Sequence, residues 1–334
     1  MPCPEPWGAM KRREFILLLG SISAAWPLRA GAQQEPANVP RIGLLWPGAS
    51  APASPRMESF RRGLREQGYV DGRNVIIELR YAQKGLQQLP DLAADFARMK
   101  VDVIWAAGDF APKVAQQATQ TIPIVCIADD VLGAGIVTNL SRPGGNTTGL
   151  TIFAQELSTK RLELLKKIFP GLSRVAAFWD PTTGTAQVTE TKNAARSLEI
   201  SLQILEVRSR DDLSNAFEAA RREHTEALDV FSSPFLASLS REIVAFATEN
   251  RLLTMFQWRE QVEAGGLASY GPGLADIWRQ SAVMVAKVLK GAKPGDLPVE
   301  QPAKLEFVIS LRTAKALGLE VPLDVLVRAD DVIE

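Results

Sequence analysis

The chain has 334 residues, more than one ordinary hydrophobic core contains, so its length predicts two domains. Charged residues make up 23% and hydrophobic residues 46%, which argues against a disordered chain and against a multi-spanning membrane protein. Basic and acidic residues balance at 38 each, so we expect no nucleic-acid partner. With one histidine, His224, and two cysteines, the chain cannot build the common zinc clusters, and a serine triad would depend on His224.

The N-terminus predicts an export signal. Basic residues at 11–13 precede an apolar stretch over 15–26, and small residues follow up to Ala32, where we expect cleavage. The stretch is shorter than the roughly 20 residues of a spanning helix, so the mature chain is expected to have no membrane span. The paired arginines resemble a twin-arginine signal, with a general secretory signal as the alternative, and Met10 is an alternative start to Met1. The expected location is the periplasm.

From position 40 onward, strands rich in Val, Ile, Leu and Ala alternate with amphipathic helices, in two series. The first series has expected strands at 41–46, 75–81, 101–107 and 122–127, with helices at 54–67, 86–99 and 112–119. The second has strands at 174–179, 201–207, 227–231 and 252–256, with helices at 154–169, 185–198, 211–222 and 236–249. This alternation is typical of parallel sheets covered on both faces. Two series predict an α/β protein of two doubly wound lobes.

A turn-rich passage at 141–149 separates the two series, and its glycines lack the spacing of a phosphate-binding loop. A last segment, with an expected helix at 275–289 and strand at 305–310, is too short for a third domain. We expect it to complete the other two, so that the chain crosses between the lobes more than once. Beyond the signal at 1–32, the expected lobes are 40–150 plus about 271–300, and 151–270 plus about 301–334.

Ligands of open parallel sheets bind beyond the carboxyl ends of the strands. Four acidic residues follow such ends: Asp109, Asp129, Asp130 and Asp180. The nearest cations, Lys113 and Arg259, are expected inside helices, which disfavours a phosphate or sulfate ligand. A ligand with an amine, hydroxyls or an aromatic ring fits better, with any carboxylate held by backbone N–H groups at helix starts. The alternative for Asp129 and Asp180 is a capping role, and the spacing matches no metal-binding loop.

Three tryptophans, Trp46, Trp179 and Trp258, also fall at strand ends, where they could wall a site for an organic ligand or only pack the domain edges. The expected place of His224 is a helix end at the opposite edge of its sheet, and the chain has no Gly-x-Ser-x-Gly elbow. We therefore expect no catalytic residues and no cofactor. Cys126, the one cysteine left after export, is expected in a buried strand, without a disulfide.

Six passages appear in a fixed order along the chain: FRRGLREQGY at 60–69, GRNV at 72–75, LSRPGGNTTG at 140–149, VEAGGL at 262–267, LKGAKP at 289–294 and TAKALG at 313–318. Together they resemble the ABC-transporter substrate-binding family often labelled as tryptophan/tyrosine transport components. The resemblance covers residues 40–334. It implies a type I periplasmic-binding-protein fold, in which two α/β lobes joined by three crossings close on a small-molecule ligand. It also implies an ABC permease and its ATPase as partners.

Strand ends and resemblance together predict these ligand-binding residues: Trp46, Pro47, Ser50, Gly108, Asp109, Asp130, Thr151, Asp180, Thr182, Ser233, Phe235, Trp258 and Tyr270. The chain departs from the family in its expected cleft. Gly-Asp-Phe stands at 108–110 where many relatives have Gly-Thr-Pro, Val131 replaces a proline, and the loop at 232–235 lacks the usual aspartate. The family label therefore does not define the ligand, which we expect to be aromatic or amphiphilic and amino-acid-like. The alternative function is a ligand-sensing module that feeds a signalling partner.

Overall fold

The computed structural model describes residues 1–2, 39–48 and 54–334. Apart from its first two residues, the expected export signal lies outside the described residues, and so does Ser50. The chain divides into two compact units, Met1–Asn38 and Val39–Glu334, and the second contains every element below. No helix within the described ranges combines the length and the apolar character needed to cross a membrane.

The first lobe is built on a five-stranded parallel sheet in the order β2-β1-β3-β4-β5. Its strands are β1 (Arg41–Trp46), β2 (Ile76–Tyr81), β3 (Val103–Ala107), β4 (Ile124–Ala128) and β5 (Thr147–Thr151). Its helices are α2 (Ser54–Glu66), α3 (Leu89–Met99), α4 (Phe110–Ala118) and, from much later in the chain, α11 (Leu274–Leu289), with a short 3-10 turn η1 (Leu86–Gln88) before α3. Cys126 is buried in β4, as expected.

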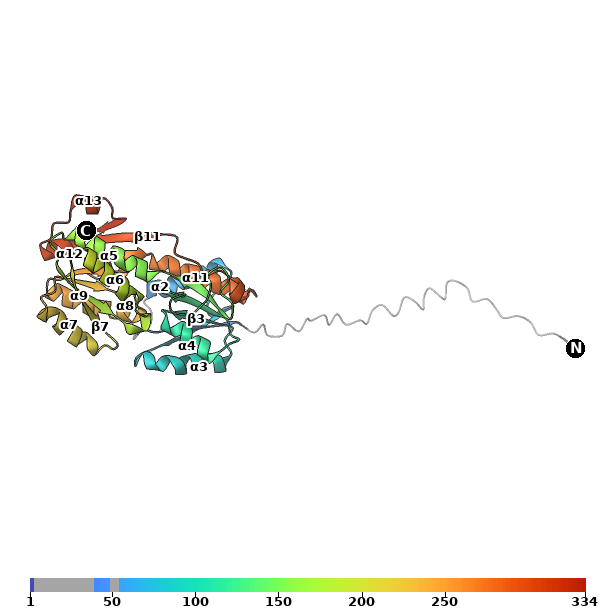
Figure 1. Ribbon diagram of the computed structural model, residues 1–334. Helices are drawn as coiled ribbons and strands as arrows, with labels where there is room; N and C mark the ends of the chain where they lie inside the picture. Colours follow the sequence, from blue (N-terminus) through green and yellow to red (C-terminus); the bar gives the residue numbers. More distant parts are fainter. Residues whose placement is uncertain (3–38, 49–53) are drawn as a thin grey trace. The chain divides into compact units, whose positions relative to one another are not determined.

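Both faces of this sheet are covered because side chains alternate along each strand. Val103 and Trp105 of β3 face the core under α2 and α11, while Ile104 and Ala106 face the core under α3 and α4. Helix α11 lies along α2 (Figure 1). Trp278 of α11 packs edge-on against Phe60 of α2 and at a tilt against Trp105 of β3, and Trp105 Nε1 donates to Ser281 Oγ of α11 at 2.9 Å. Trp278 of α11 also contacts Trp46, so the end of β1 packs against an element more than 200 residues away in sequence.

The second lobe contains a seven-stranded sheet in the order β12-β11-β10-β9-β8-β6-β7. Its strands are β6 (Arg174–Trp179), β7 (Ser201–Glu206), β8 (Ala227–Val230), β9 (Leu253–Phe256), β10 (Ala268–Pro272), β11 (Leu305–Ser310) and β12 (Asp331–Ile333). Its helices are α5 (Ala154–Ile168), α6 (Ala186–Ser197), α7 (Asp212–Arg222), α8 (Pro234–Ser238), α9 (Ser240–Glu249), α10 (Arg259–Glu263), α12 (Leu311–Leu317) and α13 (Leu323–Leu326), with a 3-10 turn η2 (Pro181–Thr183) after β6. The predicted α/β class with two doubly wound lobes is confirmed.

One pair in this sheet, β10 with β11, is antiparallel. The reason is the path of the chain. Strand β11 enters the second lobe from the crossing beside the carboxyl ends of the parallel strands, so it has to run away from that edge. His224 follows α7 at the far edge, where it is exposed.

The chain crosses between the lobes after β5, after β10, and between the 3-10 turn η3 (Pro294–Asp296) and β11. The first and third crossings are paired through their backbones. Thr151 N donates to the Glu300 carbonyl at 3.0 Å, and Glu300 N donates to the Gly149 carbonyl at 2.9 Å. We keep the lobe limits near 150, 270 and 300 as a proposal based on these crossings.

Candidate ligand-binding site between the lobes

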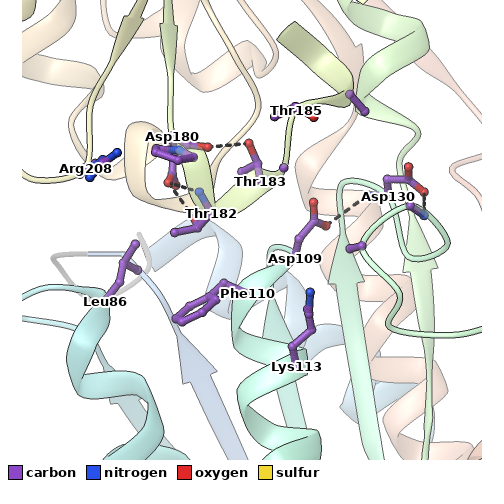
Figure 2. A pocket seen from close by; sticks show the side chains of 15 residues that line it. Leu86, Asp109, Phe110, Lys113, Asp130, Asp180, Thr182, Thr183, Thr185 and Arg208 are labelled. Atoms are coloured by element: carbon purple, nitrogen blue, oxygen red, sulfur yellow. Dashed lines mark hydrogen bonds between the residues drawn. The ribbon is translucent and has the colours of Figure 1, made fainter. Parts of the chain in front are cut away.

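A cavity of about 750 Å³, here called the wide chamber, lies where the strand ends of the two lobes face each other. The first lobe contributes Leu86, Asp109, Phe110, Lys113, Asp130, Gly133 and Ala134, and the second contributes residues 180–186 and Arg208. Figure 2 shows Asp180, Thr182 and Arg208 on one side, with Asp109, Phe110 and Lys113 on the other. Its volume falls within the roughly 300–1,000 Å³ of small-molecule sites.

A second cavity of about 40 Å³, here called the small chamber, lies beside the wide one. It is lined mainly by Trp46, Arg56, Gly108, Asp129, Ile152, Ser232, Pro234, Trp258, Leu274 and Trp278. Gly108 and Asp129 border the small chamber, while their chain neighbours Asp109 and Asp130 border the wide one. The two chambers therefore lie on either side of the ends of β3 and β4.

The lobes touch between the chambers. Ser232 of the second lobe donates its hydroxyl proton to Asp129 Oδ1 of the first. Gly108 has a φ of 75°, and a Cβ there would lie 3.1 Å from Cγ of Pro234 in the facing lobe. Glycine thus permits both the left-handed backbone and the close approach of the lobes at this point.

Asp109 follows β3 and begins α4. Its Oδ1 accepts hydrogen bonds from the backbone N–H groups of Asp129, at 2.8 Å, and Asp130, at 3.2 Å. Its Oδ2 has no hydrogen-bond partner among the described residues. Burial raises the pKa of Asp109 well above its usual value, and the negative charge of Asp129 raises it further. An amine in the wide chamber would supply the missing partner.

Asp129 is buried at the end of β4. Its Oδ1 accepts from Ser232, and within the described part of the chain its Oδ2 has no partner. Burial raises the pKa of Asp129 to about 6, against the opposing effect of the Ser232 hydrogen bond. A second carboxylate oxygen close to Asp109 is therefore available to a cation.

The aspartates at the other strand ends already accept hydrogen bonds within the protein through both carboxylate oxygens. Asp180 Oδ1 accepts from the Thr182 N–H at 2.9 Å and the Thr182 hydroxyl at 2.8 Å, and its Oδ2 accepts from Ser233 Oγ at 2.6 Å. Asp180 therefore caps η2, the alternative role that the sequence allowed. Asp130 Oδ1 accepts from the Leu132 and Gly133 N–H groups of its own turn, and its Oδ2 accepts from Gln155 Nε2 of the second lobe at 3.3 Å.

The structure divides the predicted binding residues into three groups. Asp109, Asp130, Asp180 and Thr182 line the wide chamber. Trp46, Gly108 and Trp258 line the small chamber. Pro47, Thr151, Ser233, Phe235 and Tyr270 line neither, and Ser50 is outside the described residues. For all of these residues, the assignment as ligand contacts stays a prediction.

The third group has evident structural roles. Ser233 caps α8, accepting from the Phe235 and Leu236 N–H groups, and Phe235 is buried in the core of the second lobe. Thr151 Oγ1 accepts from the Val131 N–H at 3.4 Å. Tyr270 packs against Phe307, with ring centroids 6.5 Å apart. Trp179, also considered as a wall, donates its Nε1 proton to the Gly184 carbonyl.

Phe110 and Ser232 lie in segments of the expected cleft but were not singled out as ligand contacts, and Arg56 was not predicted at all. Arg56 lies in the first turn of α2, and its guanidinium carbon is 5.8 Å from the centroid of the Trp46 ring. The signal that could have revealed Arg56 is its position in the first turn of the helix that follows β1, since a helix that follows a parallel strand begins at the carboxyl edge of the sheet. Ser232 follows β8 in the same way.

A buried polar network lies behind Ser232 in the second lobe. Gln187 accepts from the Ser232 N–H at 3.0 Å and donates to the Ser232 carbonyl at 3.1 Å. Arg161, which is fully buried, donates to Gln257 at 2.9 Å and to Ser158 at 2.8 Å, and its Nε lies 3.9 Å from Asp229 Oδ1. The backbone at Ser232 is thus fixed by the lobe itself.

The acidic groups around the chambers do not form a metal site. Within the described ranges, no group of three or more His, Cys, Asp or Glu residues is arranged to hold a metal ion.

The profile of a family described as "ABC transporter substrate binding protein" matches residues 53–333. A curated relative, the "Tyrosine-binding protein" of Clostridioides difficile (strain R20291), is 25% identical over 266 residues, covering 79% of this chain and 76% of the relative. Among solved structures, the ABC domain from Streptococcus pneumonia in complex with L-Trp is 26% identical with a TM-score of 0.80. The match covers 88% of this chain and 99% of that one.

The ligand-free, open structure of a substrate-binding protein with adhesive properties from Clostridium difficile gives a lower TM-score, 0.61, at 25% identity. It covers 89% of this chain and 99% of that one. Solute-binding proteins of lower identity share the fold, which is the type I periplasmic-binding-protein fold. The chain belongs to the ABC transporter substrate-binding protein family.

Proposed function

We propose that this protein is exported, captures an amino-acid-like organic ligand between its lobes, and delivers it to an ABC permease and its ATPase. The observation that carries the proposal is the wide chamber of about 750 Å³, which both lobes line and which Asp109 borders with an unpartnered carboxylate oxygen. A chamber lined by two lobes lets a ligand connect them.

The chemistry of the walls supports a ligand with an amine and an apolar body. Phe110, Leu86 and Pro181 contribute apolar surface to the chamber, and Asp109 contributes a carboxyl group that can accept a hydrogen bond from an amine. An aromatic side chain suits the ring of Phe110, since aromatic pairs are favourable beyond their buried area. The relatives that carry tyrosine or L-Trp in their names agree with this chemistry.

The proposed mechanism is closure of the lobes around the ligand. Shifting a cleft from 1% to 99% closed requires about 5.5 kcal/mol of preference for the closed state. A ligand of micromolar affinity supplies about 8 kcal/mol in total. Most of its binding free energy therefore has to come from contacts made with both lobes at once.

The test is a thermal-shift and calorimetry screen of the purified protein with L-tryptophan, L-tyrosine, the other amino acids and aromatic amines. A ligand at 100 times its Kd stabilises the folded state by about 2.7 kcal/mol, which raises the melting temperature measurably. Asp109→Asn is expected to weaken binding, whereas Asp91→Asn, on the exposed side of α3, is the matched control. Absence of a shift with every compound would contradict the proposal.

A further inference from the structure

One buried cation connects several segments of the second lobe. Arg161 of α5 is fully buried and lines neither chamber. Its Nη1 donates to Gln257 Oε1 at 2.9 Å, and its Nη2 donates to Ser158 Oγ at 2.8 Å and to Gln187 Oε1 at 3.4 Å. Because a planar guanidinium fixes the directions of its donors, the three acceptors are held in one geometry.

Two of these acceptors lead to contacts with Asp129 of the first lobe. Ser158 Oγ donates to the Ala154 carbonyl at 2.8 Å, and the Ala154 N–H donates to the Asp129 carbonyl at 3.1 Å. Gln187 binds both backbone groups of Ser232, whose hydroxyl donates to Asp129 Oδ1. The start of α5 and the loop after β8 therefore reach the same residue of the first lobe.

The third acceptor lies beside another contact between the lobes. Gln257 directly precedes Trp258, in the loop between β9 and α10. Trp258 is buried in the apolar cluster of the first lobe, together with Trp46 and Trp278. All three segments to which Arg161 is bonded therefore meet the first lobe.

Stability alone does not account for this cation. Its counter-charge is Asp229, whose Oδ1 lies 3.9 Å from Arg161 Nε. Apolar residues of similar volume often stabilise a core as well as a buried ion pair does, because both charges have to leave water. The charge also acts across the lobes, since burial raises the pKa of Asp129 to about 6 and the positive charge of Arg161 opposes this rise. A role in placing the contacts with the first lobe accounts for both observations.

We propose that Arg161 is a positioning residue for closure of the lobes. It holds the start of α5, the loop after β8 and the loop after β9 at a fixed spacing, so that their contacts with the first lobe form together. The contacts then stabilise the closed arrangement as one unit. Ligand affinity depends on Arg161, although Arg161 touches no ligand. This last step rests on the proposed function, whereas the joint formation of the contacts does not.

The experiment separates positioning from stability with the double variant Arg161→Met/Asp229→Leu. Apolar groups replace both buried charges, so most of the free energy of unfolding is expected to be retained. The hydrogen bonds to the three segments are nevertheless lost. In the ligand-free protein, hydrogen exchange of all three segments is expected to rise about 5- to 30-fold, the effect of one lost hydrogen bond between the lobes. Unchanged exchange of β3 shows that the variant is folded.

Two single variants complete this test. Gln187→Leu removes only the branch to Ser232, and it is expected to speed exchange beside Trp258 as well, because the contacts form together. Lys160→Met, which removes an exposed ion pair from the same helix, is the matched control and is expected to change none of the three segments. Exchange that stays unchanged in the double variant, or that rises only at Ser232 in Gln187→Leu, would overturn the proposal.

Calorimetry with L-tryptophan extends the test to the ligand. The double variant is expected to bind L-tryptophan about 5- to 30-fold more weakly, and Lys160→Met is expected to bind it within about twofold of the unmodified protein. Unchanged affinity in the double variant would overturn the role of Arg161 in ligand capture. If the unmodified protein binds neither L-tryptophan nor any other amino acid, the proposed function itself fails, while the exchange results still decide whether Arg161 positions the three contacts.

Discussion

The two lobes bring different electrostatics to the chambers they share. On the first lobe, Asp109 and Asp129 each keep one oxygen without a partner among the described residues. On the second lobe, Asp180 is held by Thr182 and Ser233. The rim of the second lobe, formed by Asp180 with Thr182 and Ser233, therefore has its hydrogen bonds complete, whereas the rim of the first lobe, formed by Asp109 and Asp129, does not.

The second rim is also supported from behind. Gln187 binds both backbone groups of Ser232, and Arg161 donates to Gln187 at 3.4 Å. Ser232 is in turn the residue that reaches across to Asp129. The Ser232 hydroxyl is thus held in position on the second lobe, while the Asp129 carboxylate on the first lobe lacks one partner. This arrangement favours binding of the ligand by the first lobe, followed by closure of the second lobe onto it.

The largest effect is expected from breaking the support of the second rim. Both Asp229 oxygens are buried without hydrogen bonds, so Arg161 provides the nearby positive charge. Arg161→Met leaves this carboxylate unpaired and is expected to lower the free energy of unfolding by about 3–5 kcal/mol. Denaturant titration measures the loss.

Two further variants make this prediction specific. Arg62→Met removes an exposed pair with Glu66 and is expected to change the free energy of unfolding by no more than about 0.5 kcal/mol. The double variant Arg161→Met/Asp229→Leu replaces both buried charges by apolar groups and is expected to recover most of the loss. A single variant as stable as the unmodified protein would show that the network does not support the rim.

The next effect concerns pH and the first rim. Asp129 has a folded-state pKa raised from 3.8 to about 6 by burial, so between these values the folded state holds a proton that the unfolded state has released. Stability therefore falls as pH rises from about 4 to about 6, by roughly 3 kcal/mol for a shift of about two pKa units. Asp129→Asn is expected to gain stability relative to the unmodified protein over this range. Denaturant titrations at pH 4, 6 and 8 measure the difference.

Ligand binding is expected to depend on pH in the opposite direction. An ammonium group pairs with the ionised form of Asp129, so affinity for an amine ligand decreases as pH falls through about 6. Calorimetry with L-tryptophan at pH 5 and pH 8 tests this effect. Affinity that stays constant, or that rises toward pH 5, would mean that Asp129 does not pair with the ligand.

The contact between the rims provides a smaller effect. Ser232→Ala removes the donor to Asp129 from the state in which the lobes are in contact. The open state is not affected, because water reaches the Asp129 carboxylate once the lobes part. Loss of the bond, worth about 1–2 kcal/mol, is expected to raise the open population about 5- to 30-fold. Hydrogen exchange of the segment around Trp258 reports the opening. Ser59→Ala, which removes a bond within α2, is expected to leave that exchange unchanged.

The sequence predicted the lobes because their signal is local. The apolar runs of β1, β3 and β4 and the helices between them follow from periodicity alone. The antiparallel β10–β11 pair could not be predicted that way, because it depends on where the third crossing enters the sheet. Periodicity did predict the helix of α11, at 275–289, but not its contact with Trp105, which joins segments far apart in the chain.

The site was predicted only in part, because strand ends identify an edge of a sheet and not the direction of a side chain. Asp109 and Asp180 both border the wide chamber, yet only the structure shows that Asp180 is fully occupied by its own lobe. Tyr270 lies inside β10, which continues to Pro272, and its ring packs on the second-lobe core. Arg56 lies in the first turn of α2, but its place beside the small chamber could not be predicted, because residues of both lobes form that chamber.

The smallest effect on stability is expected at Asp180, which accepts three hydrogen bonds within its own lobe. Thr182→Val removes one of the three hydrogen bonds that Asp180 accepts, while the Thr182 N–H and Ser233 Oγ still donate. The free energy of unfolding is expected to fall by about 0.5–1 kcal/mol, the ordinary contribution of a single hydrogen bond. Denaturant titration beside Thr189→Val, which removes an exposed hydroxyl bond within α6, gives the reference. A loss above about 2 kcal/mol would mean that Asp180 depends on this one hydroxyl, and that the second rim is as incomplete as the first.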